Sequence, residues 1–172
     1  MKAGADAADA VYACDASTEV QVRLGALEDV VRSEGEDIGL RVFIGQRSAT
    51  ISSSSMNPDV LANLVDRALD MAREAPEDQY AGLAPAELLA RGPLPDLERD
   101  DGGDPEPQLL REAALACEDA ARAVPGVTNS EGAGASAGRS IFALATSHGF
   151  AGVSHSSGYG LSASVLAGEG DA

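Results

Sequence analysis

Cations and long apolar runs are scarce in this sequence of 172 residues. Lys2 is the single lysine, and the formal net charge is −16. Because phosphate binding needs clustered cations, we expect no contact with nucleic acid and none with an anionic membrane surface. No run of roughly 18 apolar residues occurs, so no transmembrane helix is predicted.

Aromatic residues make up only 3% of the chain, and tryptophan is absent. The 44% of hydrophobic residues is rich in alanine. A core is therefore expected to consist of Val, Leu, Ile and Ala, with few large side chains to anchor it.

Cysteine is also rare, with Cys14 and Cys117 far apart in the sequence. Both lie in patterns typical of a helix, so they are interpreted as small buried residues in a reducing compartment. A disulfide between them remains the alternative. The first ten residues have no apolar segment of the kind found in signal peptides, and the cytoplasm is the expected location.

Three stretches are predicted to be helical. The alanine-rich residues 3–16 suggest a short helix. Residues 56–75 carry an apolar stripe at helical spacing, with Asn57 as the N-cap and Pro58 at the first helical position. The serines before Asn57 could instead form a recognition loop. Residues 105–124 predict a second long helix, capped by Asp104.

The remaining regular patterns alternate with the period of a strand. Residues 18–25 alternate apolar and polar side chains, and residues 27–34 continue them as a second strand or a bulged extension. Residues 38–55 predict a hairpin, and residues 141–167 predict a meander of small-residue strands with a tight turn at His148 and Gly149.

The predicted fold class is α+β, with antiparallel sheets packed against two main amphipathic helices. Two similar halves are expected, at residues 1–91 and 105–172. Residues 92–104 form an acidic linker rich in Pro and Gly, which either stays solvated or recruits a basic partner. The second half is expected to be truncated at its C-terminal end.

The glycine- and serine-rich residues 127–160 contain both histidines of the chain. A phosphate loop is not favoured, because a lysine and a following helix are missing, and a glycine-rich strand is the preferred interpretation. His148 and His155 cannot be placed beside a particular serine, so the serines are interpreted as hydroxyl-lined strand faces. No set of zinc ligands is apparent. We therefore predict no catalytic, cofactor-binding or metal-binding residue.

Several segments in order resemble the TldD/PmbA family, and in particular its PmbA (TldE) branch, historically called modulator of DNA gyrase. They are "GADAADAV", "LEDVVRSEGEDIGLRVFIGQRSATISSS", "RALDMAREAPEDQYAGLA", "VTNSEGAG" and "SHGFAG". The resemblance covers nearly the whole chain, which is then expected to be the N-terminal region of a longer protein.

The resemblance implies a cytoplasmic heterodimer in which a TldD-type subunit carries the zinc, on a His-Glu-x-x-x-His helix, and cleaves flexible peptides. This chain would then be the non-catalytic partner, acting in scaffolding, assembly and enclosure of the substrate. Small side chains in residues 139–146 and 159–167 suggest strand edges that accept an extended peptide.

Two alternatives remain open. The chain could be a stand-alone peptide- or protein-interaction module, or an independent hydrolase that uses a serine with His148 or His155.

Overall fold

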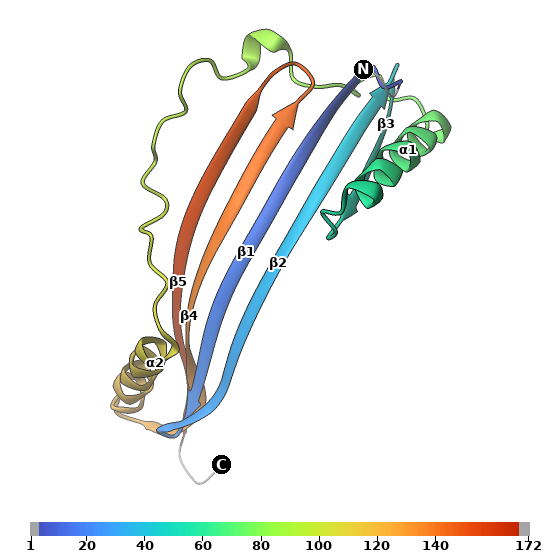
Figure 1. Cartoon of the computed structure of the whole chain (residues 1–172). Helices are drawn as coiled ribbons and strands as arrows, with labels where there is room; N and C mark the ends of the chain where they lie inside the picture. The colour runs from blue at the N-terminus through green and yellow to red at the C-terminus, as the bar shows by residue number, and fades with distance from the viewer. Residues whose placement is uncertain (1–3, 169–172) are drawn as a thin grey trace. The chain divides into compact units, whose positions relative to one another are not determined.

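The computed structural model describes residues 4–168. Five strands form one sheet in the order β3-β2-β1-β4-β5. Neighbouring strands run antiparallel, as Figure 1 shows. The α+β fold class is therefore confirmed. The elements in chain order are β1 (Ala7–Arg23), β2 (Ala26–Ile44), β3 (Arg47–Ser53), α1 (Pro58–Glu74), the 3₁₀ turn η1 (Ala86–Leu88), α2 (Pro107–Arg122), β4 (Val127–Thr146) and β5 (Ala151–Ala167).

Two compact units each draw on three separate segments of the chain. One unit comprises residues 1–14, 35–97 and 141–155, and the other comprises residues 15–34, 98–140 and 156–172. The expected halves, 1–91 and 105–172, are a division along the chain, and that division stays a prediction.

The first unit packs α1 against the β2–β3 hairpin. Strand β3 pairs with β2 from Ile38 opposite Ser53 to Ile44 opposite Arg47. Asn57 caps α1, because its Oδ1 accepts a hydrogen bond of 2.9 Å from the backbone N–H of Asp59. The buried core residues are Ala5, Ala8, Val42, Ala68, Leu69 and Ala72. The cap, Pro58 at the helix start and the hairpin are as the sequence predicts.

The second unit covers one face of its strands with α2. Its buried core residues are Val20, Val22, Leu110, Ala114, Ala133, Ala135 and Ala137. The helix lies close to its predicted range, but the predicted cap is wrong. Glu106, and not Asp104, is the N-cap residue, and it makes no side-chain cap hydrogen bond.

A carboxylate from α2 holds the turn between β1 and β2. Glu118 is 0% exposed, and its two oxygens accept hydrogen bonds from the backbone N–H groups of Leu24 (2.8 Å) and Gly25 (2.9 Å). The hydroxyl of Ser130, also fully buried, donates to the same carboxylate. Leu24 and Gly25 have φ of 50° and 80°, as a two-residue hairpin turn with both φ positive requires.

Residues 4–16 are not helical, which corrects the helix prediction for residues 3–16, of which residue 3 lies outside the described part of the chain. Residues 7–16 belong to strand β1, and Cys14 therefore lies in a strand, whereas Cys117 lies in α2 as predicted. Alanine favours helix only weakly, and packing decides the outcome here: Ala8 is buried at 8% exposure in the first unit's core. Both cysteines are free thiols.

The position of β4 corrects a further expectation. Residues 139–146 belong to β4, which lies between β1 and β5 in the sheet, so they do not form an edge. Residues 159–167 belong to β5, which is the last strand in the order. Within residues 4–168, no helix is long and apolar enough to cross a membrane.

Candidate functional site

The glycine-rich residues 131–140 lie inside strand β4, and no helix follows them. A phosphate-binding loop leads from a strand into a helix and offers its backbone N–H groups to the phosphates. In β4 the backbone continues as a strand to Thr146. The interpretation as a glycine-rich strand is therefore confirmed.

Two glycines lie where strands approach closely, and the backbone requires glycine at Gly132. Gly132 has a φ of 116°, and a Cβ added there would lie 2.8 Å from the carbonyl oxygen of Val22 in β1. A Cβ on Gly160 of β5 would lie 2.7 Å from the Oγ of Ser136. Glycine at position 132 lets β4 and β1 come together, whereas a larger residue at position 160 would only require the Ser136 hydroxyl to rotate away.

Residues 134–138 read Gly-Ala-Ser-Ala-Gly and match the G-x-S-x-G spacing of a nucleophile elbow. An elbow places its serine on a sharp turn between a strand and a helix. Ser136 instead lies in the middle of β4. The spacing therefore does not mark a catalytic serine here.

The two histidines lie in different surroundings along the β4–β5 hairpin. His148 lies in the turn, where Gly149 has a φ of 90°, and His155 lies in β5; both side chains are exposed. Among residues 4–168, no group of three or more His, Cys, Asp or Glu side chains could hold a metal ion.

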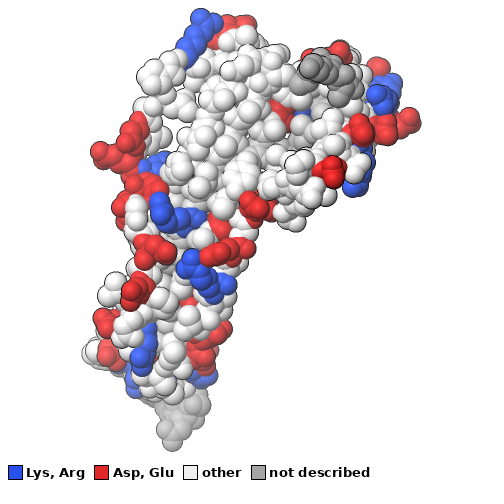
Figure 2. All heavy atoms as spheres, viewed as in Figure 1, with Lys and Arg blue, Asp and Glu red and all other residues white. Residues whose placement is uncertain are grey.

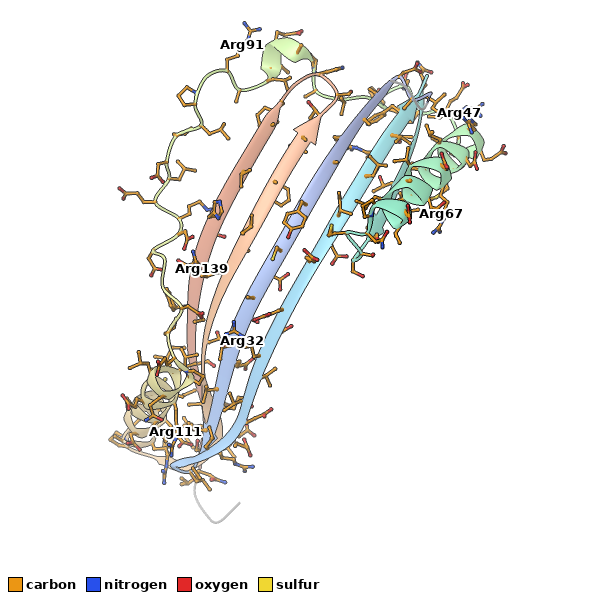
Figure 3. The ribbon with its side chains drawn as sticks, viewed as in Figure 1. Arg32, Arg47, Arg67, Arg91, Arg111 and Arg139 are labelled. Carbon is orange, nitrogen blue, oxygen red and sulfur yellow. The ribbon has the colours of Figure 1, made fainter. Side chains whose placement is uncertain are left out.

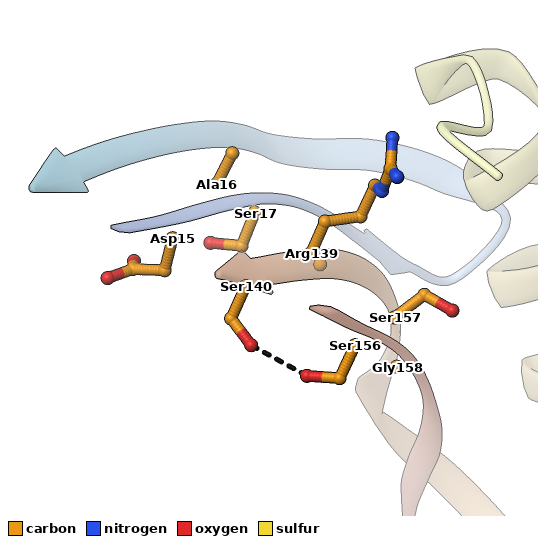
Figure 4. Close-up of a pocket in the computed structure, with 9 residues that line it drawn as sticks. Asp15, Ala16, Ser17, Arg139, Ser140, Ser156, Ser157 and Gly158 are labelled. Carbon is orange, nitrogen blue, oxygen red and sulfur yellow. Dashed lines mark hydrogen bonds between the residues drawn. The ribbon is translucent and has the colours of Figure 1, made fainter. Parts of the chain in front are cut away.

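A shallow hollow lies where β1, β4 and β5 run side by side in the second unit (Figure 4). Its volume is about 310 Å³, and it is lined by Asp15, Ala16, Ser17, Gly138, Arg139, Ser140, Ser156, Ser157 and Gly158. The hydroxyls of Ser140 and Ser156 are hydrogen-bonded at 2.7 Å. Figure 4 shows Arg139 and Ser140 pointing to opposite sides of the sheet, as neighbours in a strand do.

The linker pairs with the β5 edge beside this hollow. The backbone N–H of Ser157 donates to the carbonyl oxygen of Arg99 at 2.9 Å, and the N–H of Asp101 donates to the Oγ of Ser157 at 3.1 Å. The linker thus adds a short strand-like contact to β5. Such a contact blunts a sheet edge that would otherwise be open to another strand.

Charged and phenolic side chains fasten the linker further. Arg139, labelled in Figure 3, forms an ion pair of 2.6 Å with Asp100. The hydroxyl of Tyr159 lies 2.9 Å and 2.8 Å from the two carboxylate oxygens of Asp101. A Cβ on Gly103 would lie 2.3 Å from that hydroxyl, so a larger residue there would displace the Tyr159 side chain from its present position.

These contacts shift the pKa values of the groups that make them. The hydrogen bond to Asp101 raises the pKa of Tyr159, and the ion pair with Asp100 raises the pKa of Arg139. The pKa of Asp101 is lowered, first by the backbone N–H of Gly103 and then by Tyr159 and Ser157. All three shifts favour a charged Asp101, a charged Arg139 and a neutral Tyr159, which are the states that form these contacts with the linker.

The part of β5 from Tyr159 to Ala167 is largely exposed, although the hydroxyl of Tyr159 contacts Asp101 of the linker. Leu161 is 58% exposed and Leu166 is 40% exposed. On its inner side, this part of the strand is tied to β4 by a hydrogen bond of 3.0 Å from Ser164 to Glu131. This outer edge of β5, residues 159–167, is the candidate functional site.

Comparison with known proteins identifies the family. Residues 8–72 match the model of PmbA/TldA metallopeptidase domain 1, and residues 100–172 match the model of the PmbA/TldA metallopeptidase central domain. The chain belongs to the PmbA/TldD family. The resemblance noted in the sequence is therefore confirmed.

The curated PmbA/TldD relatives are longer than this chain. The chain is 34% identical over 172 residues to the metalloprotease PmbA homolog of Haemophilus influenzae, covering 99% of this chain and 38% of that protein. It is 31% identical over 165 residues to metalloprotease PmbA of Escherichia coli O157:H7, covering 95% of this chain and 36% of that protein.

Solved structures share the PmbA/TldD fold seen here. A putative modulator of DNA gyrase from Bacteroides thetaiotaomicron matches with a TM-score of 0.87 and 24% identity, over 99% of this chain and 39% of that one. TldE from Thermococcus kodakarensis matches with a TM-score of 0.79 and 16% identity, over 98% of this chain and 38% of that one.

Proposed function

We propose that this chain is a structural, non-catalytic region of a PmbA/TldE-type subunit, which works with a TldD-type subunit as a zinc-dependent peptidase. Its role is scaffolding, assembly with that partner and enclosure of a flexible peptide. The observation that carries the proposal is the match of both halves of the chain to PmbA/TldA metallopeptidase domains. The free cysteines fit a location in the cytoplasm.

The residues of this chain do not fit a catalytic zinc. Such a zinc takes three protein ligands, usually His with a carboxylate or Cys, and leaves one position open. No three such side chains converge within the described residues 4–168. We therefore assign the zinc to the TldD-type partner and derive no chemical step in this chain.

The contribution of this chain to peptide handling is the β5 edge, residues 159–167. An edge strand binds an extended peptide through backbone hydrogen bonds, and small side chains let the second backbone approach. Ser162, Ala163 and Ser164 supply such side chains, and all three are exposed.

Proline scanning of this edge tests the peptide role. Successive backbone N–H groups in a strand point to opposite sides. One of the variants Ser162→Pro and Ala163→Pro therefore removes a backbone hydrogen bond to β4. The other removes a backbone N–H that points away from β4, toward the place a bound peptide would occupy. The variant that keeps the stability of the wild type should capture peptide more weakly in the assembled complex. Unchanged capture by both variants would remove the β5 edge from the proposal.

Ala143→Pro is not a test of capture, because β4 is an interior strand. Proline there removes a hydrogen bond between strands and should destabilise the sheet.

Co-purification tests the assignment to a peptidase complex. A TldD-type subunit that carries zinc and copurifies with this chain in stable proportion is the expected result. A stable lone monomer that binds peptides equally well would favour the stand-alone interaction module. Hydrolysis of peptides by the isolated chain, lost on replacing His148 and His155, would favour the independent hydrolase.

A further inference from the structure

Strand β2 has a free edge in the second unit. On its outer side, β2 pairs with β3, but β3 spans only Arg47–Ser53 and its pairing covers residues 38–44 of β2. Residues 26–34 therefore have no strand on their outer side within the described part of the chain. We name this stretch the β2 edge. It is about 30 Å long, given a rise of about 3.3 Å per residue.

Every residue of the β2 edge is exposed. Among them are three apolar side chains: Leu27 is 46%, Val30 is 45% and Val31 is 49% exposed. Because side chains alternate between the faces of a strand, Leu27 and Val31 share one face and Val30 lies on the other. Both faces of the edge thus offer apolar surface to a neighbouring strand.

The charge of the β2 edge is acidic. It carries Glu28, Asp29 and Glu34 against a single cation, Arg32. Arg32, labelled in Figure 3, is already engaged: it forms an ion pair of 2.7 Å with Glu34 and donates to Thr18 at 3.3 Å. Asp29 accepts a hydrogen bond of 2.8 Å from the backbone N–H of Val30. Glu28 is therefore the acidic side chain of this edge that an incoming strand would meet.

A second acidic feature adjoins the edge. A hollow of about 250 Å³ is lined by Glu19, Gln21, Val22, Glu28, Glu131, Gly132, Ala133, Gly134, Ser162, Ala163 and Ser164. Glu28 belongs both to this hollow and to the β2 edge. A cationic side chain on a strand paired with the β2 edge would meet Glu28 first, and Glu19 of β1 lies one strand further in.

We propose that the β2 edge binds an extended, basic segment of a partner protein as an additional strand. Backbone hydrogen bonds would supply the pairing, and lysine or arginine at alternate positions would meet Glu28 and the acidic hollow. Leu27 and Val31, on the opposite face from Glu28, would pack against apolar side chains at the positions between, and Val30 would contact the aliphatic stems of the cationic side chains. The proposal rests on the β2 edge and does not depend on the proposed peptidase complex, although the hollow beside Glu28 is also lined by Ser162, Ala163 and Ser164 of β5.

Charge decides against a second copy of this chain as the occupant. Pairing two β2 edges would place acidic side chains opposite acidic side chains, and like charges directly across a strand pair are destabilising. The simpler explanation is that these charges only protect an open edge from self-association. The two explanations make different predictions. If the charges only protect the edge, a basic strand should not pair with the β2 backbone, whereas a binding site should pair with it.

Hydrogen exchange with a model peptide tests the proposal on the full chain. The probe is a short synthetic peptide of alternating lysine and valine. A fully N-methylated counterpart keeps the charges but has no backbone donors. We expect the first peptide to slow exchange at residues 26–34, and the methylated peptide to bind at least tenfold more weakly.

Paired charge reversals locate the contact. Glu28→Lys with Glu34→Lys should weaken binding about tenfold, because attraction to a cationic peptide is replaced by repulsion at two positions. Asp66→Lys with Glu74→Lys changes the net charge equally on the exposed side of α1, and it should leave binding unchanged.

Three results would overturn the proposal. They are slowed exchange confined to other residues, equal binding of the methylated peptide, and no binding at low ionic strength. Concentration-dependent dimerisation that slows exchange at residues 26–34 would replace the basic partner by a second copy.

Discussion

A glutamate as deeply buried as Glu118 needs a hydrogen-bond donor for each carboxylate oxygen, because an unpaired buried charge is strongly unfavourable. Leu24, Gly25 and Ser130 provide these donors. Burial alone raises the pKa of Glu118, but the hydrogen bonds from Ser130, Gly25 and Leu24, helped by the charge of Arg122, lower it on balance. The charged form is therefore the one built into the fold.

Glu118→Gln is expected to lower the free energy of unfolding by roughly 1–3 kcal/mol, because an amide cannot accept all of these hydrogen bonds. Urea denaturation followed by circular dichroism measures the loss. Glu112→Gln is the matched control, since Glu112 is exposed on the same helix and is contacted by Gln108. Equal loss in both variants would mean that the buried contacts add nothing.

The same carboxylate gives a pH dependence of defined sign. The pKa of Glu118 in the folded state lies below its ordinary value of 4.5. Its stabilising contribution is therefore complete above about pH 4.5 and is lost as the pH falls through the lower folded-state pKa. The difference in unfolding free energy between wild type and Glu118→Gln should be constant near neutral pH and shrink in acid. A difference that grows in acid would contradict this assignment.

Gly132→Ala should destabilise the chain by roughly 1–3 kcal/mol, because a positive φ and a contact with the carbonyl of Val22 both oppose a Cβ. Thermal unfolding reports the change. Gly158→Ala is the control, since no atom lies within 4 Å of the added Cβ there. A neutral Gly132→Ala would mean that β4 and β1 are further apart than described.

At the scale of elements, the linker is held against β5 by contacts from only a few groups. Tyr159→Phe removes the hydroxyl that contacts Asp101 and leaves the ring in place. We expect faster hydrogen exchange at residues 98–104 with an unchanged unfolding midpoint. Tyr80→Phe, at a side chain that is 85% exposed, should change neither. Unchanged exchange in Tyr159→Phe would mean that the ion pair of Arg139 with Asp100 is sufficient.

The elements differ in how far the sequence predicts them. Helix α1 is predictable because Asn57, Pro58 and its apolar stripe are all local signals. The sequence predicts the first part of β1 as helix, since the burial of Ala8 depends on distant residues such as Val42 and Ala68. The interior position of β4 was also not predictable, because strand order depends on pairing across the chain and not on the composition of a strand.

The candidate site was predictable only in outline. Residues 159–167 form an edge, as expected, but the pairing of the linker with Ser157 has no signal in the sequence. The acidic composition of the linker predicted solvation. Instead, Asp100 forms an ion pair with Arg139 of β4, and Asp101 accepts a hydrogen bond from the hydroxyl of Tyr159 of β5.

At the scale of the whole molecule, both compact units include residues from before and after the linker. Acidic side chains are spread over the face in view in Figure 2 and do not form one continuous patch. We expect that residues 1–91 and 105–172, produced as separate polypeptides, do not fold singly but assemble when coexpressed. Two-dimensional NMR of each piece and of the mixture would decide this. Well-dispersed spectra from either piece alone would contradict the expectation.

The anchoring of the β1–β2 turn by Glu118 also affects the order in which the chain can fold during synthesis. The turn residues Leu24 and Gly25 precede their carboxylate partner by 94 and 93 positions in the chain. During synthesis, both strands of this hairpin therefore leave the ribosome well before the group that fixes their turn exists. Leu24, which occupies a left-handed conformation at a cost of about 1–2 kcal/mol, has no compensation until then. The nascent β1–β2 hairpin should therefore remain loosely paired. A chaperone that binds extended apolar strands would act on it mainly before α2 is synthesised.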